Sequence, residues 1–204
     1  MKTLQVVGRK KSGKTGLVVR LLPQLQAHGL RVGTVKHSSH PYPLDREGSD
    51  SWLHRGAGAQ ATLAISAVAA SLHFPLPEGE AEIEALVEKY LGGLDLVLIE
   101  GWAGRRGPKI EVLPAGKDGV PRIPAHLDGG ELLAVVLSPG LRPARELLAP
   151  WGVLHAIGEK PDLRALVALT LRETPVPCFL WDDVATVARL VLDWHGQGGG
   201  PSNG

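Results

Sequence analysis

Apolar residues fall into short runs that alternate with longer stretches of helical periodicity along most of the chain. Strands buried on both faces of a parallel sheet typically show such continuous apolar runs. Examples are residues 132–137 (LLAVVL) and residues 95–99 (DLVLI), the latter apolar after the first residue. Because strand and helix patterns alternate, the sequence predicts an α/β fold. We expect a three-layer αβα arrangement around a mostly parallel sheet.

The predicted elements extend from the first residues to about residue 195. Strands are predicted over residues 4–7, 30–35, 59–65, 68–74, 95–99, 109–113, 132–137, 152–157 and 176–180. Helices are predicted over residues 16–25, 51–56, 81–91, 163–171 and 184–194. We therefore expect one domain over residues 1–195, followed by a disordered, glycine-rich tail over residues 196–204.

A glycine-rich loop joins the first predicted strand to the first predicted helix. Residues 8–15 (GRKKSGKT) match the phosphate-binding pattern G-x-x-x-x-G-K-[ST] at every fixed position. Gly8 and Gly13 allow backbone turns that aim N–H groups inward, and the helix adds its own N-terminal N–H groups. The alternative is a glycine-rich turn with a surface lysine, but the flanking strand and helix favour a P-loop NTPase-like fold.

Each residue of this loop receives a predicted role. Lys14 is expected to reach the β- and γ-phosphates and to act in catalysis, and the Thr15 hydroxyl is expected to bind Mg²⁺. The remaining nucleotide-binding residues predicted in the loop are Gly8, Arg9, Lys10, Lys11, Ser12 and Gly13.

Polar residues also follow two later strands. Lys36 and His37 come after the strand at residues 30–35, and Glu100 and Gly101 come after the strand at residues 95–99. Ligands of open parallel sheets bind outside the carboxyl ends of the strands, so we predict that Lys36 and His37 contact the nucleotide.

The strand that ends in Glu100 has the Walker-B arrangement. We predict that Glu100 binds Mg²⁺ or orients a water molecule, which makes it the second candidate catalytic residue beside Lys14. Gly101 is expected to let the backbone approach the γ-phosphate. A glutamate at the end of a strand is unremarkable alone, but the complete loop upstream favours the functional interpretation.

Two further segments have both functional and structural interpretations. Asp45 is predicted to bind Mg²⁺ and Asp50 to contact the nucleotide, although Asp50 is equally suited to cap the helix that follows. Residues 159–162 (EKPD) have the form x-K-x-D, which reads guanine in GTPases when asparagine comes first. Because glutamate replaces asparagine here, capping of the next helix by Asp162 explains this segment as well.

The composition limits the remaining possibilities. The 204 residues are 44% hydrophobic, carry a net charge of +1 and include one cysteine, Cys178. This excludes an internal disulfide framework and gives no sign of a nucleic-acid partner. Since no apolar run reaches the roughly 18 residues needed to span a bilayer, we expect a cytoplasmic protein without a membrane segment.

Several separated segments resemble one family, that of the molybdopterin-guanine dinucleotide biosynthesis protein MobB. The chain differs from the usual family pattern at Ser38-Ser39, where histidines are common, and at Gly48-Ser49, where the family has glycine-lysine. The similar segments are GRKKSGKT at 8–15, TVKH at 34–37, D-x-x-G-x-D-S at 45–51, RGAGA at 55–59, LIEGW at 98–102, KIEV at 109–112 and P-x-F-x-x-D-D at 177–183.

This resemblance implies a GTP-binding accessory protein of molybdenum cofactor biosynthesis. By analogy with the family, the expected ligands are GTP and Mg²⁺, and the expected partners are a MobA-like guanylyltransferase, the molybdenum cofactor and a second copy of the chain. Any GTPase activity is expected to be slow. The residues alone also allow a small-molecule kinase or ATP-dependent ligase on the same fold, or a scaffold with a vestigial loop.

Overall fold

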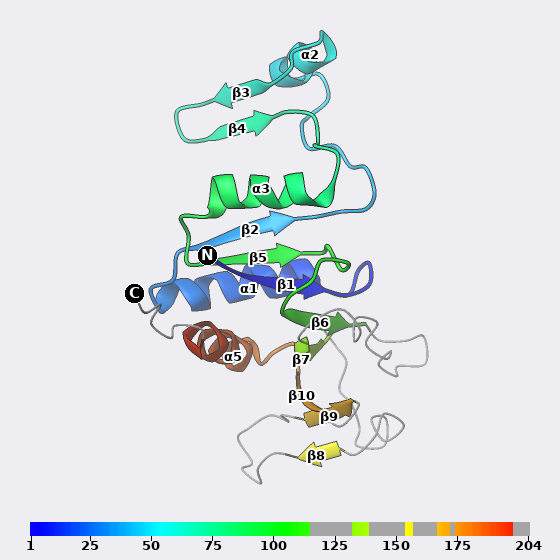
Figure 1. The fold of residues 1–204 in the computed structure, drawn as a ribbon, viewed down its shortest axis with the longest axis vertical. Helices are drawn as coiled ribbons and strands as arrows, with labels where there is room; N and C mark the ends of the chain where they lie inside the picture. Colours follow the sequence, from blue (N-terminus) through cyan, green and yellow to red (C-terminus); the bar gives the residue numbers. More distant parts are fainter. Residues whose placement is uncertain (115–131, 139–153, 157–166, 172–173, 198–204) are drawn as a thin grey trace. The chain divides into compact units, whose positions relative to one another are not determined.

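The computed structural model describes residues 1–114, 132–138, 154–156, 167–171 and 174–197 (Figure 1). Contacts between Cα atoms divide the chain into two compact units. The first unit comprises Met1–His37 and Leu91–Gly204, and the second comprises Ser38–Tyr90. The expectation of a single domain over residues 1–195 stays a prediction.

The first unit is built on an eight-stranded sheet with the order β2-β5-β1-β6-β7-β10-β9-β8 (Figure 1). The six strands from β2 to β10 run parallel, whereas β9 is antiparallel to both β10 and β8. The predicted α/β class with a mostly parallel sheet is therefore confirmed. The strands are β1 (Lys2–Val7), β2 (Val32–Lys36), β5 (Leu96–Glu100), β6 (Lys109–Leu113), β7 (Leu132–Leu137), β8 (Leu154–Ala156), β9 (Val167–Leu171) and β10 (Thr174–Phe179).

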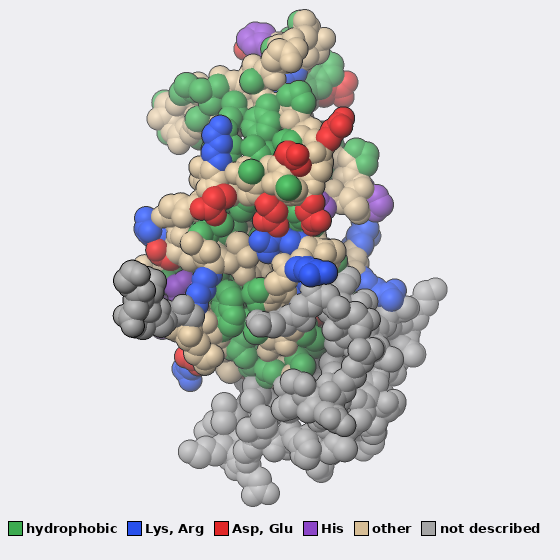
Figure 2. Space-filling view, in the orientation of Figure 1, with side chains coloured by type: hydrophobic (Ala, Val, Ile, Leu, Met, Phe, Trp, Pro, Cys, Tyr) green, Lys and Arg blue, Asp and Glu red, His purple; other side chains and the backbone are tan. Residues whose placement is uncertain are grey.

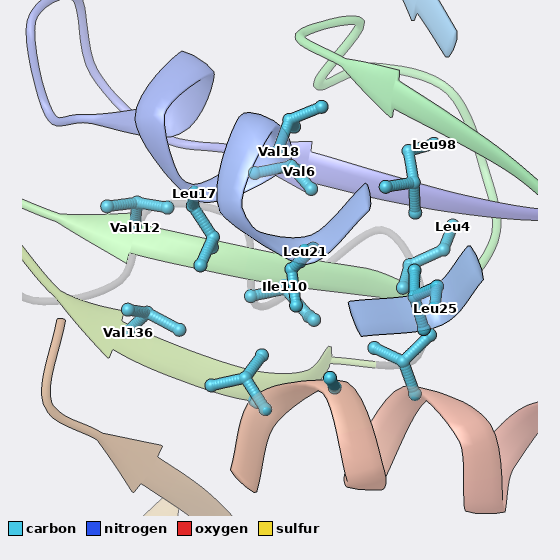
Figure 3. Packing of buried hydrophobic residues seen from close by; sticks show 14 of the residues in the cluster. Leu4, Val6, Leu17, Val18, Leu21, Leu25, Leu98, Ile110, Val112 and Val136 are labelled. Atoms are coloured by element: carbon cyan, nitrogen blue, oxygen red, sulfur yellow. The ribbon is translucent and has the colours of Figure 1, made fainter. Parts of the chain in front are cut away.

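Helices α1 (Lys14–Ala27) and α5 (Val184–Gln197) pack beside each other on the sheet. Leu17, Leu21 and Leu25 are fully buried against strand residues that include Leu4 and Val6 (Figure 3). Burying a side chain of this size stabilises a fold by about 1.5–3 kcal/mol. This cluster anchors α1, so the loop between β1 and α1 is held at both of its ends.

The alternate positions of β1 and β6 carry buried polar side chains. Gln5, Lys109 and Glu111 are all almost completely buried. The Lys109 ammonium donates to the carbonyl oxygen of Arg105 at 2.7 Å, and the Gln5 amide donates to that of Arg106 at 3.3 Å. Burial, and to a lesser degree the positive charge of Arg105, lowers the pKa of Lys109. The loop after β5 thus accepts hydrogen bonds from two donors that the sheet buries.

The second unit contains α2 (Asp50–Gly56), the hairpin of β3 (Thr62–Ile65) and β4 (Ala70–His73), and most of α3 (Glu80–Leu91). The hairpin strands pair in the register Leu63 opposite Leu72. Hydrophobic side chains are exposed on the hairpin, among them Leu63, Ile65 and Val68, and acidic side chains gather on α3 (Figure 2).

One predicted helix is wrong. Instead of a helix over residues 163–171, the structure has strand β9 over Val167–Leu171, and residues 163–166 lie outside the described part. Val167–Leu171 pairs along its whole length with β10, so hydrogen bonding to a neighbouring strand overrides the local helical pattern. The last helix also extends to Gln197, two residues into the predicted tail, whose other residues are not described.

Candidate functional site

The loop between β1 and α1 adopts a conformation that depends on glycine. Gly8 and Gly13 have φ values of 138° and 103°, and Lys11 lies in the left-handed region with φ of 63°. A Cβ atom on Gly8 would lie within 3.0 Å of both the Val112 carbonyl oxygen and the Ser12 hydroxyl. Substitution at Gly8 would therefore force the loop away from strand β6.

Helix α1 begins at Lys14, directly after the loop. The Leu17 N–H donates to the carbonyl oxygen of Gly13, the residue before the helix, at 3.0 Å. The N–H groups of the residues before Leu17, which include Thr15 and Gly16, have no carbonyl one turn earlier within the helix. They form the N–H-rich end at which a helix binds anions.

The Lys14 side chain folds back over the loop. Its ammonium donates to the carbonyl oxygens of Gly8 at 2.9 Å and Arg9 at 2.7 Å. The pKa of Lys14 is lowered on balance. Burial is the largest cause, the charge of Glu100 opposes it by raising the pKa, and the charge of Lys36 lowers the pKa further. The ammonium therefore lies inside the curve of the loop.

Two further features of the loop suit an anionic ligand. The Ser12 hydroxyl is completely buried and has no hydrogen-bond partner among the residues that the structure describes. Arg9, Lys10 and Lys11 are all exposed on the loop. Phosphate oxygens would accept hydrogen bonds from the loop and neutralise this concentration of positive charge.

Glu100 lies at the end of β5 and accepts from two elements at once. The Thr15 hydroxyl donates to Glu100 Oε1 at 2.8 Å, and the Lys36 ammonium forms an ion pair with the same oxygen. The Glu100 side chain is 8% exposed and that of Lys36 is 49% exposed. A buried carboxylate needs such partners, because an unpaired buried charge costs several kcal/mol by typical estimates.

The turn after Glu100 is fixed by close contacts with the end of β2. Gly101 has φ of 90°, and a Cβ atom there would collide with the His37 carbonyl oxygen. The Gly101 N–H donates to Val6 O at 3.0 Å. Glycine is thus required by the packing of β2 against this turn, and its predicted approach to a γ-phosphate stays a prediction.

Trp102 is a site residue that the sequence argument missed. It has φ of 55° and is 8% exposed, and its ring stacks on His37 with centroids 5.0 Å apart and planes 12° apart. His37, predicted to contact the nucleotide, is therefore held by an aromatic partner beside Glu100. The sequence offered only one indication of this role, namely that Trp102 is the last residue of the LIEGW segment.

Asp45 belongs to the second unit and has partners there. Its carboxylate accepts from the Ser49 hydroxyl at 3.1 Å and from Arg55 Nη2 at 3.1 Å. Asp50 lies in the same unit, in the first turn of α2, and the helix is capped by Ser49, whose hydroxyl accepts from Trp52 N–H at 3.2 Å. The predicted roles of Asp45 and Asp50 stay predictions.

The first unit brings together several of the predicted site residues. They are Lys14, Thr15, Lys36, Glu100 and the loop residues with their backbone amides. Their donors and the orphaned Ser12 hydroxyl fit the phosphates of a nucleotide, and an oxygen pair from threonine and glutamate fits Mg²⁺, a hard cation that prefers oxygen ligands. The x-K-x-D segment at residues 159–162 lies outside the described residues.

The fold and this arrangement define the class of the protein. A mostly parallel α/β sheet, with a glycine-rich loop leading from its central strand into a helix, is the architecture of P-loop NTPase-like proteins. Residues 3–138 match the family described as Molybdopterin guanine dinucleotide synthesis protein B. The chain belongs to this MobB family.

Curated relatives carry a corresponding name. The molybdopterin-guanine dinucleotide biosynthesis adapter protein of Escherichia coli (strain K12) is 35% identical over 118 residues, 57% of this chain and 66% of that protein. The protein of the same name from Haemophilus influenzae is 34% identical over 108 residues, 52% of this chain and 60% of that protein. The chain thus spans less than two thirds of the length of either relative.

Solved structures agree in fold. The crystal structure of Bacillus subtilis MobB superposes with a TM-score of 0.62 at 24% identity, covering 95% of this chain and 97% of that chain. A MobB homologue from Bacillus stearothermophilus gives a TM-score of 0.58 at 23% identity, covering 97% and 99%. In the part of the chain that the structure describes, no helix is long and apolar enough to span a membrane.

Proposed function

We propose that this chain is a GTP-binding adapter protein of molybdopterin guanine dinucleotide biosynthesis. Family membership supports the pathway, since curated relatives are named as adapters of that biosynthesis. The observation that carries nucleotide binding is the convergence of Thr15 and Lys36 on one oxygen of Glu100, beside a glycine-rich loop at the start of a helix.

Each group at the site has a part in binding. The loop amides and Lys14 would hold the phosphates, and Thr15 and Glu100 would hold Mg²⁺, whose charge would neutralise that of the phosphates. Lys36 is paired with Glu100 and would face the nucleotide from the end of β2. Glu100 would be occupied with Mg²⁺ and not free to orient a water molecule, so GTP hydrolysis is slow.

The proposed setting follows from the family. The chain acts in the cytoplasm as a homodimer and assists a MobA-like guanylyltransferase, with the molybdenum cofactor as a further partner.

The proposal is tested by adding the purified chain to a molybdopterin guanylyltransferase supplied with Mg²⁺-GTP and the molybdenum cofactor. The wild-type chain is expected to raise the yield of dinucleotide cofactor, whereas Lys14→Ala is expected not to. Lys89→Ala, which removes a lysine from α3, is the matched control and should act like the wild type. Equal stimulation by Lys14→Ala would contradict the proposal.

A further inference from the structure

Trp181 lies in the turn between β10 and α5 and reaches the start of α1. The turn is closed by a hydrogen bond from Asp183 N–H to Leu180 O at 3.0 Å. A Cβ atom on Gly16 would lie 2.9 Å from Cζ2 of the Trp181 ring, so only glycine lets the ring come this close to α1. Gly16 directly follows Thr15 and is the last residue before the first helical hydrogen bond of Leu17.

Arg20, one turn further along α1, fixes the same tryptophan. Its Nη1 donates to the Trp181 carbonyl oxygen at 2.8 Å, and its guanidinium carbon lies 5.5 Å from the centre of the ring. Trp181 is half-buried and packs at the margin of the main hydrophobic cluster. Arg20 and Gly16 thus hold the ring beside the N–H-rich end of α1, and Trp181 keeps part of its surface accessible.

The order of the strands indicates how a nucleotide would be oriented in the site. Glu100 and Lys36 end β5 and β2, which lie on one side of β1, whereas β6, β7 and β10 lie on the other side (Figure 1). Mg²⁺ and the terminal phosphates belong at Glu100, and the loop N–H groups hold the phosphates nearer the ribose. The nucleoside therefore leaves the loop on the side of β10, where Trp181 is found.

We propose that Trp181 is the platform on which the nucleoside part of the bound nucleotide packs, with Arg20 and Gly16 as its positioning residues. This inference rests on the proposed nucleotide binding and adds a residue to it from the far end of the chain. Stacking on an aromatic ring tolerates any base, because every base has a π-face. Trp181 thus contributes affinity for the nucleoside without selecting guanine over adenine.

The test compares ligands that do and do not have a nucleoside. GTP, ATP and inorganic tripolyphosphate are titrated with Mg²⁺ into the wild type, Trp181→Leu and Trp181→Phe, with binding followed by calorimetry. Trp181→Leu is expected to weaken GTP and ATP about 5- to 150-fold and to leave tripolyphosphate unchanged. Trp181→Phe, which keeps an aromatic face, is expected to retain most of the GTP affinity.

Trp194→Leu is the matched control, because Trp194 packs against the same hydrophobic cluster but lies beside Lys2 at the start of β1. It should leave all three affinities unchanged. An equal loss of GTP and tripolyphosphate binding in Trp181→Leu would overturn the inference, as would unchanged GTP binding, and either result would leave the proposed function standing. If the wild type bound none of the three ligands, the proposed function would fail together with the inference.

Discussion

At the scale of single residues, the site is organised around one oxygen atom of Glu100. A hydroxyl from the loop helix and an ammonium from β2 share it, so three separate segments meet at this carboxylate. About half of the Lys36 side chain is exposed, which allows it to turn away when another cation arrives. We therefore expect Lys36 and Mg²⁺ to compete for Glu100.

This competition predicts the behaviour of Lys36→Met. Removing the ammonium should lower the Mg²⁺ concentration needed for half-maximal GTP binding by roughly two- to fivefold, the effect of a half-exposed ion pair worth up to about 1 kcal/mol. Calorimetric titration of GTP at a series of Mg²⁺ concentrations measures it, with Lys89→Met as the control. A higher Mg²⁺ requirement in Lys36→Met would show that Lys36 supports the metal instead.

A second prediction concerns Gly101, whose φ is 90° and whose missing Cβ makes room for the His37 carbonyl oxygen. Gly101→Ala should destabilise the protein by about 1–3 kcal/mol, because it adds backbone strain and a steric clash. Urea unfolding measures the change. Gly104→Ala, at a position with nothing within 4 Å and without a positive φ, should be close to neutral. Similar stabilities for the two variants would contradict this account of the turn.

The loop residues and Glu100 could be identified from the sequence because their spacing reflects a fixed backbone geometry. Trp102 could not be identified, since nothing in the sequence around it shows that its ring stacks on His37, which lies more than 60 residues earlier. The same holds for Trp181, whose contact with Gly16 depends on the sheet placing β10 near α1.

At the scale of elements, the starts of β2 and β5 are joined by an ion pair outside the core. Asp95 accepts from the backbone N–H of Arg31 at 2.8 Å and from its guanidinium at 2.9 and 3.2 Å. The Arg31 side-chain hydrogen bonds are the main reason that the pKa of Asp95 falls to about 2. This pair lies at the opposite end of the strands from Glu100.

The lowered pKa sets the pH range in which the pair stabilises the fold. Because the folded pKa is depressed, the stabilisation is fully present above pH 3.8 and is lost as the pH falls to about 2. The melting temperature of the wild type should therefore exceed that of Asp95→Asn by a constant amount near neutral pH, and the gap should close towards pH 2. Thermal unfolding at several pH values measures the gap, and a gap independent of pH would count against this pair.

Element types were predictable where a periodic pattern was strong, and less so where pairing decided the outcome. The predicted strand over residues 109–113 matches β6, although alternation gave no sign that Lys109 and Glu111 would both be buried. The helix predicted over residues 163–171 was wrong, because β9 gains its hydrogen bonds from β10 and β8, which local periodicity does not report.

At the scale of the whole molecule, the predicted site residues are divided between two compact units. The loop, Lys36 and Glu100 belong to the sheet-containing unit, whereas Asp45 and Asp50 belong to the unit of residues 38–90. Asp45 is paired with Arg55 inside its own unit. Spacing along the chain suggested a shared site, but it could not reveal that a separate unit carries these two carboxylates.

The central claim is that the loop binds a Mg²⁺-nucleotide, and calorimetric titration of the full chain with GTP tests it most directly. We predict saturable binding that Mg²⁺ strengthens and that Lys14→Ala weakens at least about tenfold, since Lys14 makes charge-assisted hydrogen bonds to the phosphates. Absence of saturable binding with Mg²⁺ present, or equal affinity in Lys14→Ala, would contradict the account.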